Sequence, residues 1–244
     1  MKPLERKIWI VLSIALIGCI GLWFTTKHYQ SKWTNVPPPP GKLSAAGAGL
    51  GDTIFAYRSY GILLQNMGDQ GGRTTNLRDY NFENLGNWFT LLHSFDSKSN
   101  FIPYIASFYF GGVDDENHPQ KLKPIVDYLE IAGNSTEGEK WRWLAQAAYI
   151  ARFKMKDLDR ALNIAQKLST LDNPNLPMWA RNMPANVLNA QGEKEAAYGL
   201  LLSILDSEGD KMQAAEINAT KAYICEQILD TAEAKNNPLC QGDF

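Results

Sequence analysis

Two stretches of the chain carry the same pattern: WLAQAAYIARFKMKDLDRALNIAQKL at residues 143–168 and WARNMPANVLNAQGEKEAAYGLLLSI at residues 179–204. The offset is 36 residues (179 minus 143), and it pairs Trp143 with Trp179, Asp157 with Glu193, Ala161 with Ala197 and Leu168 with Ile204. Both stretches begin with apolar residues spaced three and four apart, which is typical of a helix with one buried face. Self-similarity at such a spacing predicts a row of helix–turn–helix units. An irregular helical bundle with chance similarity is the alternative.

The turn inside each stretch has a common form. Gly192 and Glu193 precede an alanine in the second stretch, whereas Lys156 stands at the glycine position of the first. The pattern resembles the tetratricopeptide repeat, a helix–turn–helix unit of about 34 residues that stacks into a solenoid. Three features depart from that family: the longer period, the missing tyrosine of the first helix, and Pro184, which is expected to kink the helix that contains it.

Flanking segments extend the repeats in both directions. A divergent copy runs from FIPYIASFYFGG (101–112) to PQKLKPIVDYLEIA (119–132), with a longer connection between its helices. Helices are also expected at 53–66 and 82–94, and a capping helix at 212–233. The predicted fold is all-α, a single N-terminal transmembrane helix followed by a TPR-like solenoid of helical hairpins. The predicted divisions are an anchor (1–26), a Pro/Gly-rich linker (27–51), N-terminal helices (52–99), repeats (100–211), and a capping helix with a tail (212–244).

The anchor is the uncharged run IWIVLSIALIGCIGLWF at residues 8–24, which follows three basic residues. Its seventeen residues are at the short end of what spans a bilayer, and Trp9 and Trp23 suit the aromatic belts of a spanning helix. Leu16-Ile17-Gly18-Cys19 also matches the site at which bacterial lipoproteins are cut and lipidated. The apolar run continues after Cys19, which favours a retained helix, with lipidation at Cys19 as the second interpretation.

The anchor is followed by the four prolines of residues 37–40 and the small residues of 45–51. Together they predict a stand-off between the membrane and the folded part. Proline runs also serve as ligands for aromatic grooves. The signal-like order of a short basic tail and one apolar run favours a domain on the extracytoplasmic side, in the bacterial inner membrane.

Cys225 and Cys240 both lie in the last twenty residues, and the Asn-Asn-Pro between them would let the tail fold back. In an oxidising compartment they are a candidate disulfide. A buried thiol at 225 and an unpaired one at 240 is the alternative interpretation.

No arrangement of residues predicts chemistry. The three histidines are scattered, no cysteine pair has metal spacing, and the sequence indicates no catalytic residue, metal or cofactor. The net charge of −2 and the pI near 6.0 give no bulk attraction for nucleic acid.

What remains is a surface for partners. The family resemblance implies that the solenoid reads extended or helical peptides with the exposed face of its first helices. On the matched positions that face carries Arg142, Tyr149, Arg152, Met178 and Arg181. Arginine and tyrosine are enriched at interfaces, although solvated charges and a core tyrosine would give the same pattern.

The expected function is therefore non-enzymatic: a membrane-tethered scaffold or adaptor that binds protein or peptide partners in the assembly, secretion or quality control of envelope complexes. The alternative is an accessory subunit or lipoprotein of a larger envelope enzyme complex. A pocket with clustered ionisable groups would favour that alternative.

Overall fold

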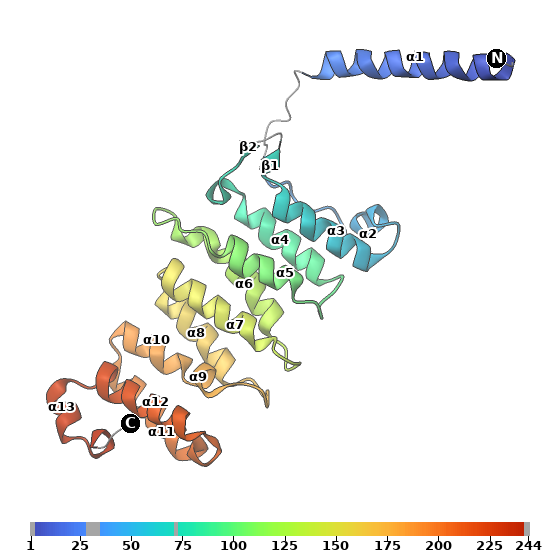
Figure 1. Cartoon of the computed structure of the whole chain (residues 1–244). Helices are drawn as coiled ribbons and strands as arrows, with labels where there is room; N and C mark the ends of the chain where they lie inside the picture. Colours follow the sequence, from blue (N-terminus) through green and yellow to red (C-terminus); the bar gives the residue numbers. More distant parts are fainter. Residues whose placement is uncertain (1–2, 28–34, 71–72, 242–244) are drawn as a thin grey trace.

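A computed structural model describes residues 3–27, 35–70 and 73–241 of the chain. Almost all of the regular structure in these residues is helical, and a two-residue antiparallel pair, β1 (Asp69–Gln70) with β2 (Arg73–Thr74), is the one exception. The predicted all-helical fold is confirmed. Figure 1 shows the helices after α1 arranged one after another from the N-terminal to the C-terminal end of the folded part.

Helix α1 (Pro3–Thr26) contains the predicted anchor. Its residues Lys7–Thr26 form one helix that is long and apolar enough to cross a membrane, and none of that stretch is buried by the rest of the chain. Cys19 is an exposed free cysteine on this helix. Part of the expected anchor and linker (residues 1–2 and 28–34) and the end of the tail (242–244) lie outside the described residues.

The folded part consists of helix pairs. The first helices of the pairs are α3 (Thr53–Asn66), α5 (Phe101–Tyr104) with η2 (Ile105–Phe110), α7 (Trp141–Tyr149) with η4 (Ile150–Lys154), α9 (Met178–Arg181) with α10 (Met183–Gln191), and α12 (Ala214–Tyr223) with η6 (Ile224–Ile228). The second helices are α4 (Phe82–His93), α6 (Lys123–Gly133), α8 (Leu158–Ser169), α11 (Lys194–Glu208) and α13 (Thr231–Asn236). Short connecting elements are α2 (Lys42–Ala48) and the 3₁₀ turns η1 (Leu77–Asp79), η3 (Pro119–Leu122), η5 (Gly209–Lys211) and η7 (Pro238–Cys240).

Neighbouring helices pack in chain order. α6 packs on α7, α7 on α8, α8 on α10 and α10 on α11, while the second helices α4 and α6 also contact each other. Small residues allow the closest approaches: a Cβ atom on Gly133 would lie 2.5 Å from the backbone nitrogen of Leu144, and one on Gly86 would lie 2.7 Å from the Cβ of Pro124. The predicted apolar stripes are the faces that pack, since Leu144, Ala147, Ala148 and Ala151 are all buried.

The linker expected at 27–51 differs from the structure in its second half. Val36 is buried, its carbonyl accepts a hydrogen bond from Asn84 at 2.7 Å, and the Pro37 carbonyl accepts one from the Trp88 indole at 2.8 Å. Ala45 of helix α2 is also fully buried. The second half is therefore part of the folded domain and not a stand-off. The physical reason is that an extended proline-rich segment has no internal hydrogen bonds, so its carbonyls can accept hydrogen bonds from side chains of α4.

The capping helix expected at 212–233 is also shorter than predicted. α12 ends in the π-helical turn η6, and Asp230 begins the separate helix α13 by accepting hydrogen bonds from the backbone nitrogens of Ala232 and Glu233. A carboxylate in that position caps a new helix better than it continues an old one. The chain then turns back, and a disulfide joins Cys225 to Cys240, with the Cα atoms 5.7 Å apart.

Pro184 interrupts its helix as expected. The chain breaks at Asn182 between α9 and α10, and the proline lies in the first turn of α10, where its missing backbone N–H costs no helical hydrogen bond.

Candidate functional site on the first helices

Two tyrosine–phenylalanine pairs lie on successive first helices. Tyr104 and Phe108 have ring centroids 5.0 Å apart, and Tyr149 and Phe153 have centroids 4.8 Å apart. Residues four apart share one side of a helix, so each pair forms one patch. All four side chains are large and exposed, although other aromatic residues of the same helices, such as Phe110, are buried. The two helices that carry the pairs contact each other.

A π-helical turn underlies each pair. Tyr104 and Tyr149 directly precede the π turns η2 and η4, and Phe108 and Phe153 lie within them. A π turn holds an extra residue per turn and is often found at functional sites. The two pairs therefore occupy corresponding positions on helices with the same irregularity.

Arginines border the second pair. The Arg152 guanidinium lies 4.6 Å from the centre of the Phe153 ring. Arg142, about two helical turns before Tyr149 on α7, lies 5.5 Å from the Trp141 ring and forms an ion pair with Glu139 at 2.6 Å. A guanidinium in a cation–π contact can still donate hydrogen bonds to a carboxylate, as Arg142 does to Glu139.

Trp179 on α9 adds a further exposed aromatic side chain, beside the start of α7. Its ring packs edge-on against Trp141, with centroids 5.5 Å apart, and its side chain is 53% exposed. We call the exposed set the aromatic face; its members are Tyr104, Phe108, Tyr149, Phe153 and Trp179, with Arg142 and Arg152 at its border.

The predicted groove residues differ in how exposed they are. Arg142 and Tyr149 are exposed, and Arg152 and Arg181 are partly exposed. Met178, in contrast, is buried, so it does not belong to the exposed surface as predicted. Its neighbour Trp179 takes that place.

The register of the alignment explains the error at Met178. The sequence pairs Trp143 with Trp179, yet Trp143 is 7% exposed and Trp179 is 53% exposed. By burial, Trp179 corresponds to Arg142, the residue before Trp143, so the offset there is 37 residues (179 minus 142). The π turn η4 supplies the extra residue before the following turn, and α10 has no such turn. Periodicity assumes regular helices and cannot reveal this shift.

Polar contacts fix the helix that carries the second pair. The Trp143 indole donates to the Asn100 side chain at 3.0 Å, and the buried Lys140 ammonium donates to the Ser99 carbonyl at 3.0 Å. Burial lowers the pKa of the Lys140 ammonium from its ordinary value. At the other end of the helix, Lys154 pairs with Asp114 at 2.5 Å, in the loop that follows η2. Both ends of α7–η4 are thus tied to the preceding pair, which gives the aromatic face a rigid base.

Four members of the aromatic face are not among the residues predicted from the sequence: Tyr104, Phe108, Phe153 and Trp179. For the two pairs a signal existed, because aromatic residues four apart lie outside the apolar stripe of each expected helix.

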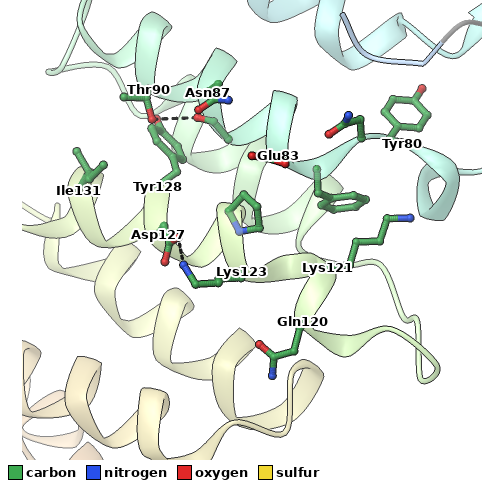
Figure 2. A pocket seen from close by; sticks show the side chains of 14 residues that line it. Tyr80, Glu83, Asn87, Thr90, Gln120, Lys121, Lys123, Asp127, Tyr128 and Ile131 are labelled. Atoms are coloured by element: carbon green, nitrogen blue, oxygen red, sulfur yellow. Dashed lines mark hydrogen bonds and ion pairs between the residues drawn. The ribbon is translucent and has the colours of Figure 1, made fainter. Parts of the chain in front are cut away.

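One hollow on the second helices lies between α4 and η3–α6, and Figure 2 shows its lining. It has a volume of about 600 Å³ and contains ionisable side chains. Lys123 and Asp127 neutralise each other at 2.6 Å, and the Lys121 ammonium is bound to the Arg78 carbonyl. Burial raises the pKa of the Tyr128 hydroxyl, which stays protonated. The lining contains neither histidine nor cysteine; its carboxylates are Glu83 and Asp127, and Asp127 is paired with Lys123.

Within residues 3–27, 35–70 and 73–241, no three His, Cys, Asp or Glu side chains gather closely enough to hold a metal ion. Compared with known protein families, with curated proteins and with solved structures, the chain matches none of them.

Proposed function

We propose that this chain is a single-pass membrane scaffold that binds protein or peptide partners through the aromatic face. The observation that carries the proposal is the repetition of exposed, stacked aromatic pairs on neighbouring helices. An apolar surface of this kind on a folded domain marks an interaction site. Tyrosine, tryptophan and arginine are the residues that most often dominate binding energy.

The chemistry of the face favours a peptide segment with apolar and acidic side chains. Tyr149 and Phe153 offer ring faces for apolar side chains, and Arg142 and Arg152 offer planar donors for carboxylates. We propose no reaction, metal or cofactor for this surface, because it holds no histidine, cysteine or carboxylate group other than Glu139, which is paired with Arg142.

A TPR-like repeat is part of the proposal, and the turns support it. Lys156 and Gly192, which the alignment pairs, both have left-handed backbone angles, with φ values of 58° and 87°. Asp157 and Glu193 follow as the N-cap residues of α8 and α11. Corresponding residues thus make the same turn in two successive pairs, as a repeated unit requires.

We further propose that α1 crosses the bacterial inner membrane and that the helix pairs lie on the extracytoplasmic side. The disulfide between Cys225 and Cys240 supports this side, because such bonds persist in oxidising compartments. Partners in the assembly, secretion or quality control of envelope complexes would be found there.

The test is a crosslinking pull-down from membranes with the full-length chain and the double variant Tyr149→Ser/Phe153→Ser. Removing two partly exposed rings should leave the fold intact, since surface changes cost little stability. It should weaken a partner held by both rings by about 2–4 kcal/mol, enough to lose it from the pull-down. Arg142→Ala/Arg181→Ala provides a second arm, in which Arg142 is expected to contribute most of the effect.

Ile131→Ser is the matched control, because Ile131 is a half-exposed apolar residue on α6 that lines the hollow of Figure 2. Circular dichroism confirms equal helicity of all variants. The proposal fails if the tyrosine–phenylalanine variant keeps every partner. Loss of partners from Ile131→Ser alone would place the binding surface in the hollow instead.

A further inference from the structure

The start of the folded part exposes large apolar side chains that the domain itself does not use. Leu43 on α2 is 90% exposed, and Leu50, in the turn after it, is 93% exposed. Ile54 and Phe55 follow in the first turn of α3, and both are exposed. We call these four residues the apolar corner. Leucines that are almost wholly in water contribute nothing to the packing of this domain.

The inner side of α2 shows why the leucines point outward. Ala45 is fully buried, and a Cβ atom on Gly49 would lie 2.8 Å from the Cβ of Ala56. Small residues therefore bring α2 against α3, and the larger ones are left on the outside. Leu50 also has a φ of 56°, a left-handed conformation that disfavours leucine and favours glycine. Neither packing nor backbone preference explains a leucine there.

The tether between α1 and the folded part limits where this corner can go. Asn35 is fixed to the domain, since its side chain donates to the Asp79 carbonyl at 3.0 Å and accepts from the Asn81 backbone nitrogen at 2.5 Å. From Lys27, the last described residue of the anchor, to Asn35 the chain reaches at most about 30 Å in any conformation.

The chain then runs beside α4 to the corner. Lys42 donates to the Ser94 carbonyl at the end of that helix, at 3.3 Å. α4 has 12 residues, so the corner begins about 18 Å from Asn35 at 1.5 Å per helical residue. In Figure 1 the α2–α3 end of the row of helices is the end nearest α1, and α9–α13 form the opposite end.

From these observations we infer that the apolar corner docks on the lipid surface of the membrane that α1 crosses, with its leucines at the boundary between headgroups and acyl chains. The tether keeps the corner at a high effective concentration near lipid, so a weak apolar contact suffices. A protein partner or a second copy of the chain would need its own complementary surface, whereas the bilayer is present wherever the anchor is. The inference rests on the proposed insertion of α1.

The experiment uses the full chain reconstituted into vesicles of a bacterial-type phosphatidylethanolamine and phosphatidylglycerol mixture, with a fluorescent NBD group on single cysteines. The corner is probed with Gly47→Cys in a Cys19→Ser background, because Gly47 is an exposed residue of α2 whose Cβ would meet nothing within 4 Å. Lipids that carry a nitroxide on their acyl chains quench NBD only at short range.

Two further labels act as references. Natural Cys19 reports whether α1 is inserted. Gly199→Cys reports whether α11, far from the apolar corner in the chain, contacts lipid; Gly199 is exposed, and its Cβ would meet nothing within 4 Å. We expect quenching at positions 19 and 47 and none at position 199. Leu43→Ser/Leu50→Ser should remove the quenching at 47, because losing each leucine from the interface disfavours contact by roughly tenfold or more.

Each departure has a distinct meaning. Without quenching at Cys19, the anchor is not inserted, and both the anchoring proposal and the corner inference fall. With quenching at Cys19 but not at 47, the anchoring stands and the corner inference is wrong. Equal quenching at 47 and 199, or quenching at 47 that survives the loss of both leucines, also overturns it.

Discussion

The central helix pairs and the C-terminal ones are all helical but have very different cores. From Val36 to Val187 one continuous cluster buries large residues, including Tyr57, Phe89, Phe110 and Tyr128. The C-terminal cluster has as its buried members only Ala185, Ala197, Leu201, Ile224 and Ile228. Because stabilisation follows the apolar area removed from water, the C-terminal part gains much less from its core.

Local and covalent bonds compensate at the C-terminal end. Reciprocal capping boxes begin α12, between Gln213 and Glu216, and α13, between Asp230 and Glu233. The disulfide ties the last turn back to η6. The comparison teaches that the terminal helices, which have neighbours on one side only, are held by caps and a cross-link, whereas the central helices are held by packing.

The largest expected effect comes from placing a charge in each core. Leu144→Asp leaves an unpaired carboxylate in the central cluster and should cost more than about 4 kcal/mol, enough to unfold the central pairs. Leu201→Asp should unfold only the C-terminal cluster and leave the central pairs helical. Hydrogen exchange followed by mass spectrometry shows which helices unfold in each variant. Equal protection of the central pairs in both variants would mean that the clusters are not independent.

An intermediate effect is expected on breaking the disulfide. Cys225→Ser/Cys240→Ser opens a loop with a sequence separation of 15 residues, and the loss should be about 3 kcal/mol in the chain-entropy model. The loss should appear as faster exchange in α12 and α13, with the central pairs unchanged. In the native chain both thiols should resist alkylation until reduced. If both thiols were alkylated freely under oxidising conditions, the disulfide would be absent and the proposed extracytoplasmic location would lose its support.

The smallest effects are expected at the two corresponding turns, at Lys156 and Gly192. Lys156→Gly should raise the free energy of unfolding by up to about 1 kcal/mol, since the left-handed angle there suits glycine. Gly192→Ala should lower it by about 1 kcal/mol, because its Cβ has open space and the cost is purely conformational. Urea unfolding of each variant and of the native chain measures both changes in the free energy of unfolding. The same sign for both would contradict the equivalence of the turns.

Several elements could be predicted because their causes are local. Apolar spacing located the helices at 53–66 and 82–94 to within a residue, since periodicity reports which face a helix buries. Pro184 was expected to interrupt its helix because its ring prevents a regular one. Arg142, Tyr149 and Arg152 were placed on an exposed side of their helix because they lie outside its apolar stripe.

The sequence by itself thus determined the helical class, the apolar N-terminal run, the repeated turns and part of the exposed face. Tertiary structure decided the rest. The π turn η4 shifted the register by one residue and exchanged Met178 for Trp179, because helix irregularity depends on the neighbours against which a helix packs. The attachment of Val36 and Pro37 to α4 was equally hidden, since those hydrogen bonds join residues about 50 apart in the chain. Local propensity is written in a short stretch of sequence, whereas such contacts exist only after distant segments meet.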